Sequence, residues 1–219
     1  MNLIAIDCST PQASVALWAN EVLFERIEVT QKNHATVILP LLQTLLDAAS
    51  VSMSEISGIV FGCGPGSFTG LRIACGLAKG LAFSHDLPLY PVSSLFNMAY
   101  QIHSQAMSSI MPVLSLIDAH MQEVYWRYSH GEMDIQKEYV TPISDITIPA
   151  MNPLWLVHAN VAQSILEKLP VFIQERIQKT VLCMPSAAMM IQAVLKGGIL
   201  PVSAEAASPV YIRNKVTHG

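Results

Sequence analysis

The feature that most constrains the fold is a pattern that occurs twice, an apolar strand that ends in an aspartate and leads into further short strands. The first copy covers residues 3–6 and ends at Asp7, and the second covers residues 112–117 and ends at Asp118. In each copy, apolar stretches separated by turn residues predict a three-stranded antiparallel meander. Although the two halves share little else, this repetition indicates an internal duplication.

The residues that follow each meander predict further strands and the helices that would cover them. In the first half, strands are predicted at 3–6, 14–18, 22–29 and 56–61, and helices at 33–49, 71–83 and 93–104, with Asn33 as a helix cap. In the second half, strands are predicted at 112–117, 123–128, 134–140 and 154–157, and helices at 161–169 and 186–196. Because a mixed sheet needs helices over its apolar faces, this order predicts an α/β, actin-like (ASKHA) fold, which is a duplicated ribonuclease H-like unit. The expected subdomains are 1–106 and 107–219.

Composition limits the classes of function that this chain could have. Hydrophobic residues make up 52% and charged residues 13%, so part of the apolar surface is expected to be buried against another chain. The formal charge is −4 with only 12 Lys plus Arg and no basic run, which excludes strong binding of a nucleic-acid backbone by this chain alone. Neither a signal peptide nor an 18-residue apolar run is found, so a cytoplasmic protein is expected. The four cysteines form no C-x-x-C pair and are expected to be buried thiols.

A glycine-rich loop at residues 62–70 follows a predicted strand and precedes a predicted helix. Such a loop can present backbone N–H groups to an anion. The known phosphate-binding patterns fail here, because Gly70 is followed by Leu71 instead of the lysine of a Walker A loop. A serine-hydrolase elbow is also excluded, since Ser67 is flanked by Pro65 and Thr69 where glycines are required. A structural turn and an anion site therefore both remain open.

The two aspartates could belong to a nucleotide site, because actin-like ATPases hold their metal–phosphate acids at such strand ends. A weak or vestigial nucleotide site would consist of Asp7, Ser9, Gly64, Gly66 and Asp118. The alternative for Asp7 is that its carboxylate caps the backbone amides of the turn at residues 8–10. None of the seven histidines forms an H-x-x-x-H pair, so no metal site is expected and a metallopeptidase is nearly excluded. No catalytic residue and no cofactor are predicted.

Small residues form rows along the helix predicted at 71–83. Ala74 and Ala78 recur at a spacing of four, and Gly76 and Gly80 form a second row. Small residues in such rows let another helix approach closely, although packing on the chain's own sheet is an alternative. Together with the apolar residues of the helix at 33–49, this row predicts a partner-binding surface of Val37, Ile38, Leu41, Leu45, Arg72, Ala74 and Ala78.

Several segments resemble the signature of the TsaB family, also called YeaZ. The segment GPGSFTGLRI at 64–73, followed by AKGLA at 78–82, carries the resemblance most strongly. AIDCST at 5–10, PVSSL at 91–95, IDA at 117–119 and PVYIR at 209–213 are also similar to the family. The resemblance spans nearly the whole chain, but residues 141–200 match only loosely.

The resemblance implies a supporting subunit without catalytic activity. Proteins of this family were once classed as inactive glycoprotease homologues of the peptidase M22 type; they share the fold of the catalytic subunit TsaD. The resemblance implies that the chain binds and activates TsaD, in a complex that includes the ATPase TsaE and transfers threonylcarbamoyl to adenosine in tRNA. It further implies a homodimer when the chain is alone, contact with tRNA only through the complex, and no membrane partner. The alternative function is an actin-like ATPase or phosphotransferase that uses Asp7, Asp118 and the loop at 64–70.

Overall fold

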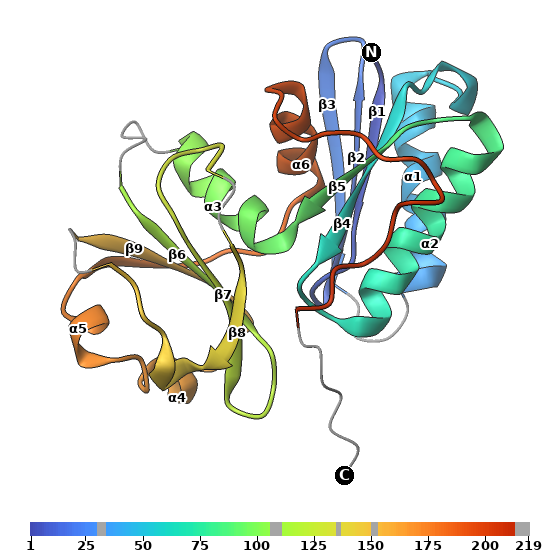
Figure 1. Cartoon of the computed structure of the whole chain (residues 1–219). Helices are drawn as coiled ribbons and strands as arrows, with labels where there is room; N and C mark the ends of the chain where they lie inside the picture. The colour runs from blue at the N-terminus through green and yellow to red at the C-terminus, as the bar shows by residue number, and fades with distance from the viewer. Residues whose placement is uncertain (30–33, 106–110, 135–136, 150–152, 213–219) are drawn as a thin grey trace.

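The computed structural model describes residues 1–29, 34–105, 111–134, 137–149 and 153–212, and it contains two five-stranded sheets (Figure 1). The first sheet has the order β3-β2-β1-β4-β5 and consists of β1 (Leu3–Asp7), β2 (Gln12–Ala19), β3 (Val22–Val29), β4 (Gly58–Gly64) and β5 (Leu89–Ser93). The second has the order β10-β9-β6-β7-β8 and consists of β6 (Val113–Asp118), β7 (Glu123–Ser129), β8 (Tyr139–Pro142), β9 (Leu154–Ala159) and β10 (Ile177–Leu182).

The two sheets have the same topology, which confirms the predicted duplication and the actin-like fold class. In each sheet, three consecutive strands pair antiparallel, as β1 with β2 and β2 with β3, and as β6 with β7 and β7 with β8. The remaining two strands are then added in parallel on the other side of the first strand, as β4 and β5 or as β9 and β10. Both predicted strand-end aspartates lie at the corresponding position, the last residue of β1 and of β6.

Helices cover both faces of each sheet (Figure 1). The helices are α1 (His34–Ala49), α2 (Phe68–His85), α3 (Ser94–Gln105), α4 (Gln163–Leu166), α5 (Val171–Gln174) and α6 (Ala187–Leu195). The first sheet lies between α1 and α2 on one face and α6 on the other, and its strands are fully buried at residues such as Ile4 and Ala5. In the second sheet, α3 covers one face and α4 and α5 lie against the other. Because α3 also contributes Phe96 and Tyr100 to the core of the first sheet, it joins the two halves.

The structure corrects several predicted elements. The strand predicted at 134–140 is wrong: β8 is a shorter strand that begins at Tyr139, and residues 135–136 lie outside the described residues. The helix predicted at 161–169 is reduced to the four residues of α4. β5 had no predicted counterpart; it contains Pro91 and is an edge strand, where proline is tolerated. β10 and α5 had no predicted counterpart.

After β10 the chain returns to the first half of the molecule. α6 packs on the first sheet, and Val202 forms an antiparallel bridge with Leu89 of β5. The predicted subdomain boundary at 106/107 and the predicted cap Asn33 both lie outside the described residues. The division into 1–106 and 107–219 therefore stays a prediction, and α6 belongs in space with the first sheet.

Glu25 on β3 links the beginning of α6 to the first sheet through hydrogen bonds. Its Oε1 atom accepts hydrogen bonds from Ser14 Oγ at 2.8 Å, from Ser186 Oγ at 2.8 Å and from the Ala188 N–H at 3.2 Å. Ser186 in turn caps the helix, since its Oγ accepts from the Met189 N–H at 3.3 Å. One carboxylate oxygen thus holds together β2, β3 and α6.

We expect Glu25→Ala to lower the free energy of unfolding by about 1–3 kcal/mol, because it removes a charged acceptor from a buried helix start. Urea denaturation would measure the change. Glu28→Ala is the matched control, since Glu28 is exposed on the same strand. An equal loss in both variants would contradict a specific role for Glu25.

Candidate functional site

A cleft of about 520 Å³ lies between the two halves, at the ends of β1 and β6. The first half contributes Ser9, Thr10, His34 and the loop at 66–69, and the second half contributes Asp118, His120, Tyr125 and Asn160. Of the five residues predicted for a nucleotide site, the structure therefore brings Ser9, Gly66 and Asp118 together. Asp7 and Gly64 do not line the cleft.

Asp7 is fully buried behind the turn that follows β1. Its Oδ1 accepts hydrogen bonds from the Ser9 N–H at 3.0 Å and from Ser9 Oγ at 2.8 Å, and its Oδ2 has no hydrogen-bond partner among the described residues. Burial raises the pKa of this carboxyl to about 6, although the two hydrogen bonds from Ser9 act in the opposite direction. The prediction that Asp7 contacts a nucleotide is contradicted by its burial, and the interpretation as a turn cap fits its hydrogen bonds.

The glycine-rich loop packs directly against the turn after β1. The Ser67 N–H donates to the Ser9 carbonyl at 2.8 Å, and Ser67 Oγ caps α2 by accepting from the Gly70 N–H at 3.3 Å. A Cβ atom on Gly66 would lie 2.3 Å from the Ser9 carbonyl oxygen, and one on Gly70 would lie 1.9 Å from that of Cys8. These two positions require glycine because the two backbones approach so closely. The loop thus serves the packing of the fold, and two of its amides already have partners.

The charge of the cleft does not favour a phosphate group. Asp118 contributes a carboxylate, whose Oδ1 accepts from the His120 N–H at 2.9 Å and whose Oδ2 lies 3.6 Å from His120 Nδ1. Neither lysine nor arginine is found among the described residues that line the cleft. In the part of the chain that the structure describes, no group of three or more His, Cys, Asp or Glu residues could hold a metal ion. The cleft therefore offers hydroxyl groups, imidazoles and one carboxylate.

Four of the seven residues predicted to bind a partner lie in the protein's own core. Ile38, Leu45, Ala74 and Ala78 are fully buried, because α1 and α2 pack these side chains against the first sheet. Their prediction as partner contacts is wrong. Val37 and Leu41 are half-buried beside the same core.

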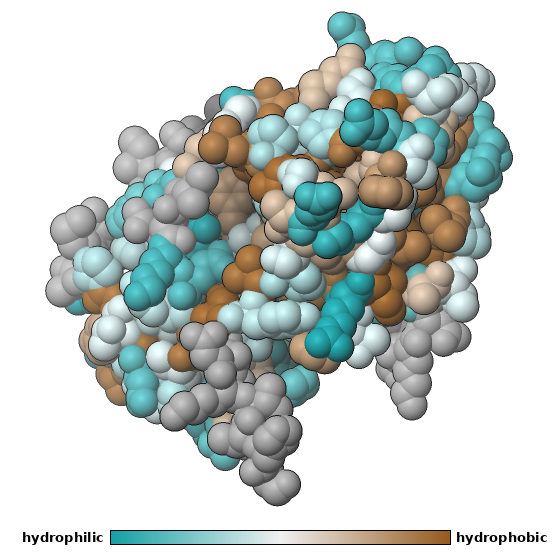
Figure 2. Space-filling model, turned by 45° about the vertical axis from the view of Figure 1, so that its right-hand side comes forward, coloured by the Kyte–Doolittle hydropathy of each residue, from teal (hydrophilic) through white to brown (hydrophobic). Residues whose placement is uncertain are grey.

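The exposed face of α2 instead consists of Arg72, Gly76, Gly80 and Phe83, here called the glycine face. A Cβ on Gly76 or Gly80 would meet no atom within 4 Å, and Phe83 is 84% exposed. Arg72 lies 3.8 Å over the ring of Phe68 and donates from Nε to the Tyr211 hydroxyl at 3.2 Å. Figure 2 shows hydrophobic surface exposed among hydrophilic side chains on this side of the molecule. In the sequence, this face was indicated by two glycines within a predicted helix, because each glycine is less favourable than alanine there by roughly 1 kcal/mol.

No helix in the described ranges combines the length and the apolar character that crossing a membrane requires.

Comparison with known proteins relates the chain to one pathway. The family model of TsaD, a tRNA N6-adenosine threonylcarbamoyltransferase, matches residues 22–181, which is more than half of the chain. The tRNA threonylcarbamoyladenosine biosynthesis protein TsaB of Haemophilus influenzae is 31% identical over 99% of this chain and 95% of its own length. TsaB of Escherichia coli is 40% identical over 136 residues, which are 62% of this chain and 58% of that protein.

A solved structure extends the similarity to the complete fold. The structure of YeaZ from Pseudomonas aeruginosa superposes with a TM-score of 0.83 at 31% identity, covering 96% of this chain and 99% of that one. A coverage of 96% leaves too few residues unaligned to omit either five-stranded sheet. The chain therefore belongs to the TsaB (YeaZ) family, whose members are named tRNA threonylcarbamoyladenosine biosynthesis proteins.

Proposed function

We propose that this chain is a non-catalytic subunit that binds and activates TsaD, together with TsaE, for the transfer of threonylcarbamoyl to adenosine in tRNA. The observation that carries the proposal is the glycine face of α2, an exposed helix surface on which glycines leave room for a second helix to approach. Membership of the TsaB family supports TsaD as the partner that supplies this helix. In the absence of TsaD, a second copy of the chain would occupy the same face and give a homodimer.

The composition of the cleft supports a role without catalysis. The carboxylate of Asp7 is buried behind the turn, and Asp118 is the one carboxylate among the described residues of the cleft. A net charge of −4 also supports contact with tRNA through the complex, since this chain offers few cations to replace the counterions of the RNA. The proposed location is the cytoplasm, where tRNA is modified.

The alternative, an actin-like ATPase or phosphotransferase, is favoured by one observation. Ser9, Gly66 and Asp118 line the same cleft, which is large enough for a small molecule. It is opposed by the burial of Asp7 and by the absence of lysine and arginine from the described lining of that cleft. A nucleoside triphosphate would therefore meet no lysine or arginine in the described part of the cleft.

Reconstitution from purified subunits tests the proposal. We expect the chain alone to hydrolyse no ATP above background, and a mixture of TsaD and TsaE to modify tRNA only when the chain is added. Product formation is measured by the transfer of label to tRNA from threonylcarbamoyl-adenylate that carries labelled threonine, with AMP as the leaving group. ATP hydrolysis by the isolated chain that is lost in Asp118→Ala would support the alternative, and full tRNA modification without the chain would contradict the proposed function.

A further inference from the structure

A second cavity, of about 460 Å³, lies at the junction of the two halves and shares no lining residue with the cleft. Its wall is mostly apolar, with Val92, Phe96, Leu200 and Val210 among its residues. A volume of this size is within the range of small-molecule sites, which combine apolar walls with a few polar groups.

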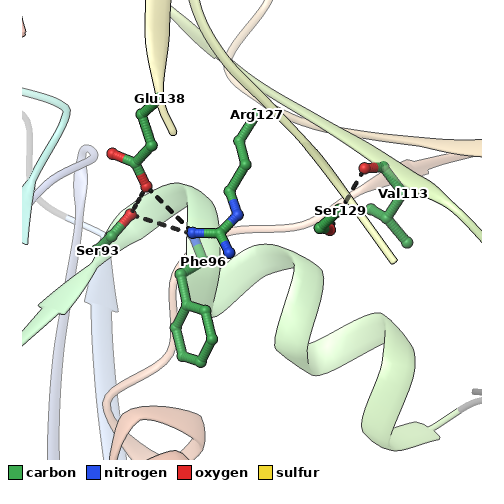
Figure 3. Close-up of polar contacts among 6 residues, drawn as sticks. All are labelled: Ser93, Phe96, Val113, Arg127, Ser129 and Glu138. Carbon is green, nitrogen blue, oxygen red and sulfur yellow. Dashed lines mark hydrogen bonds and ion pairs between the residues drawn. The ribbon is translucent and has the colours of Figure 1, made fainter. Parts of the chain in front are cut away.

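The charged residues of the wall are Glu138, directly before β8, and Arg127 of β7. Oε1 of Glu138 accepts a hydrogen bond from Ser93 Oγ and lies 3.5 Å from Arg127 Nη1. Figure 3 shows that the second carboxylate oxygen of Glu138 is directed away from Ser93 and Arg127. The protein therefore uses Oε1 for its own contacts, and Oε2 is left for another donor.

The Oε2 atom of Glu138 can be reached by a ligand in the cavity. Among the described residues it has no hydrogen-bond donor, yet it is not fully buried, in contrast to the unpaired Nε and Nη2 of Arg127. The charge of Glu138 also acts on Cys63, another residue of the wall: burial raises the pKa of this thiol to about 12, and the Glu138 carboxylate contributes to the increase. One carboxylate oxygen thus remains available in a largely apolar space.

The charges around the cavity favour a cationic ligand. Burial lowers the pKa of the Arg127 guanidinium, and the carboxylates of Glu138 and Asp134 act in the opposite direction, so two negative charges act on one positive charge. No lysine is found among the described residues of the wall. An ammonium group would compensate the remaining negative charge and would donate a charge-assisted hydrogen bond. The apolar wall favours a ligand with an apolar body.

We propose that this cavity binds a small organic ammonium ion with an apolar body, whose ammonium group donates a hydrogen bond to Oε2 of Glu138. Arg127 and Ser93 hold the carboxylate in place through its other oxygen. The site is independent of the cleft and of the glycine face, and therefore of the proposed function.

Calorimetric titration of the full chain with benzylamine, benzyl alcohol and benzoate at neutral pH tests this site. We expect benzylamine, which is an ammonium ion at this pH, to bind at millimolar concentration with one site per chain. Benzyl alcohol has nearly the same shape without the charge and should bind about tenfold more weakly, because charge-assisted hydrogen bonds are the stronger ones. Benzoate should not bind, since its charge is repelled by Glu138. Benzylamine that fails to bind, or that binds no better than benzyl alcohol or benzoate, would overturn the proposal.

Glu138→Gln links the binding to the carboxylate. Glutamine keeps an oxygen that can accept from Ser93 and Arg127, but it removes the negative charge. We expect benzylamine to bind about tenfold more weakly to this variant and benzyl alcohol to bind nearly as it does to the parent chain.

Leu200→Lys tests the same site without changing the ion pair, in case Glu138→Gln does not fold. Leu200 is 78% exposed at the cavity, so the variant should fold, and its positive charge should weaken benzylamine binding about threefold by repulsion. Val171→Lys is the matched control and should bind benzylamine as the parent chain does, since Val171 is 68% exposed on α5 and does not line the cavity. Unchanged benzylamine binding in folded Leu200→Lys, or in folded Glu138→Gln, places the site elsewhere and refutes the proposal.

Discussion

A Gly80→Leu variant is expected to fold at least as well as the parent chain but to bind TsaD roughly 5- to 150-fold more weakly. Gly80 is exposed on α2, and a side chain there would meet no atom of the protein within 4 Å. Leucine is favoured over glycine in a helix by roughly 1 kcal/mol, so the stability should rise slightly. In the proposed complex with TsaD, the same side chain would occupy the space that the glycine face leaves for a helix of the partner.

Ala78→Leu is the matched control on the same helix, with the opposite expected result. Ala78 is fully buried in one core cluster with Ile59 and Phe61 of β4. Overpacking this contact should lower the free energy of unfolding by about 1–3 kcal/mol. Urea denaturation separates the two effects on folding, and calorimetric titration with TsaD measures association. TsaD binding that is unchanged in Gly80→Leu would show that the glycine face is not the partner surface.

The contrast between these two positions also explains where prediction from the sequence failed. Successive residues of a helix are 100° apart, so Ala78 and Gly80 differ by about 200° and lie on nearly opposite faces. The sequence distinguishes the two rows of small residues, since each recurs at a spacing of four. It does not reveal which row faces the sheet, because alanine and glycine are both small enough for a close contact. The outcome depends on which side of α2 packs on β4, and this packing involves residues far away in the chain.

The fold could be predicted where the signal was local. Asp7 and Asp118 ended two apolar strands, and both strands are the first of their sheets. β5 could not be recognised in this way, since an edge strand tolerates the proline at position 91 that otherwise indicates a turn. The second sheet also contains β10, which was not predicted because its sequence mixes polar and apolar residues.

The burial of Arg127 and its ion pair with Glu138 could not be predicted from the sequence, for another reason. An arginine in a strand is usually exposed, and Arg127 alternates with the buried Trp126, which would place it on a solvated face. In the structure that second face of β7 is covered by α3, and Glu138 supplies a charge from a segment eleven positions further along the chain. Burial of a charged residue depends on how the two halves meet, which no local pattern contains.

Asp7→Asn is expected to make the protein more stable at neutral pH and to remove much of the pH dependence of its stability. Burial raises the pKa of Asp7 from 3.8 to about 6, so the folded chain binds this proton more tightly than the unfolded chain does. The stabilisation from protonated Asp7 is therefore present below about pH 4 and is lost as the pH rises through 6. The difference between pKa values of 3.8 and about 6 corresponds to roughly 3 kcal/mol at most.

Asparagine imitates the protonated carboxyl, since its Oδ1 can still accept both hydrogen bonds from Ser9. Urea denaturation at a series of pH values between 3.5 and 7.5 should give similar stabilities for the two proteins at the acidic end and an increasing advantage for Asp7→Asn toward neutral pH. Asp118→Asn is the matched control, because Asp118 ends the corresponding strand of the second half but is partly exposed at the cleft. A difference between Asp7→Asn and the parent chain that stays constant over this range would contradict a raised pKa, and it would mean that Asp7 is ionised to the same extent in the folded and unfolded chains.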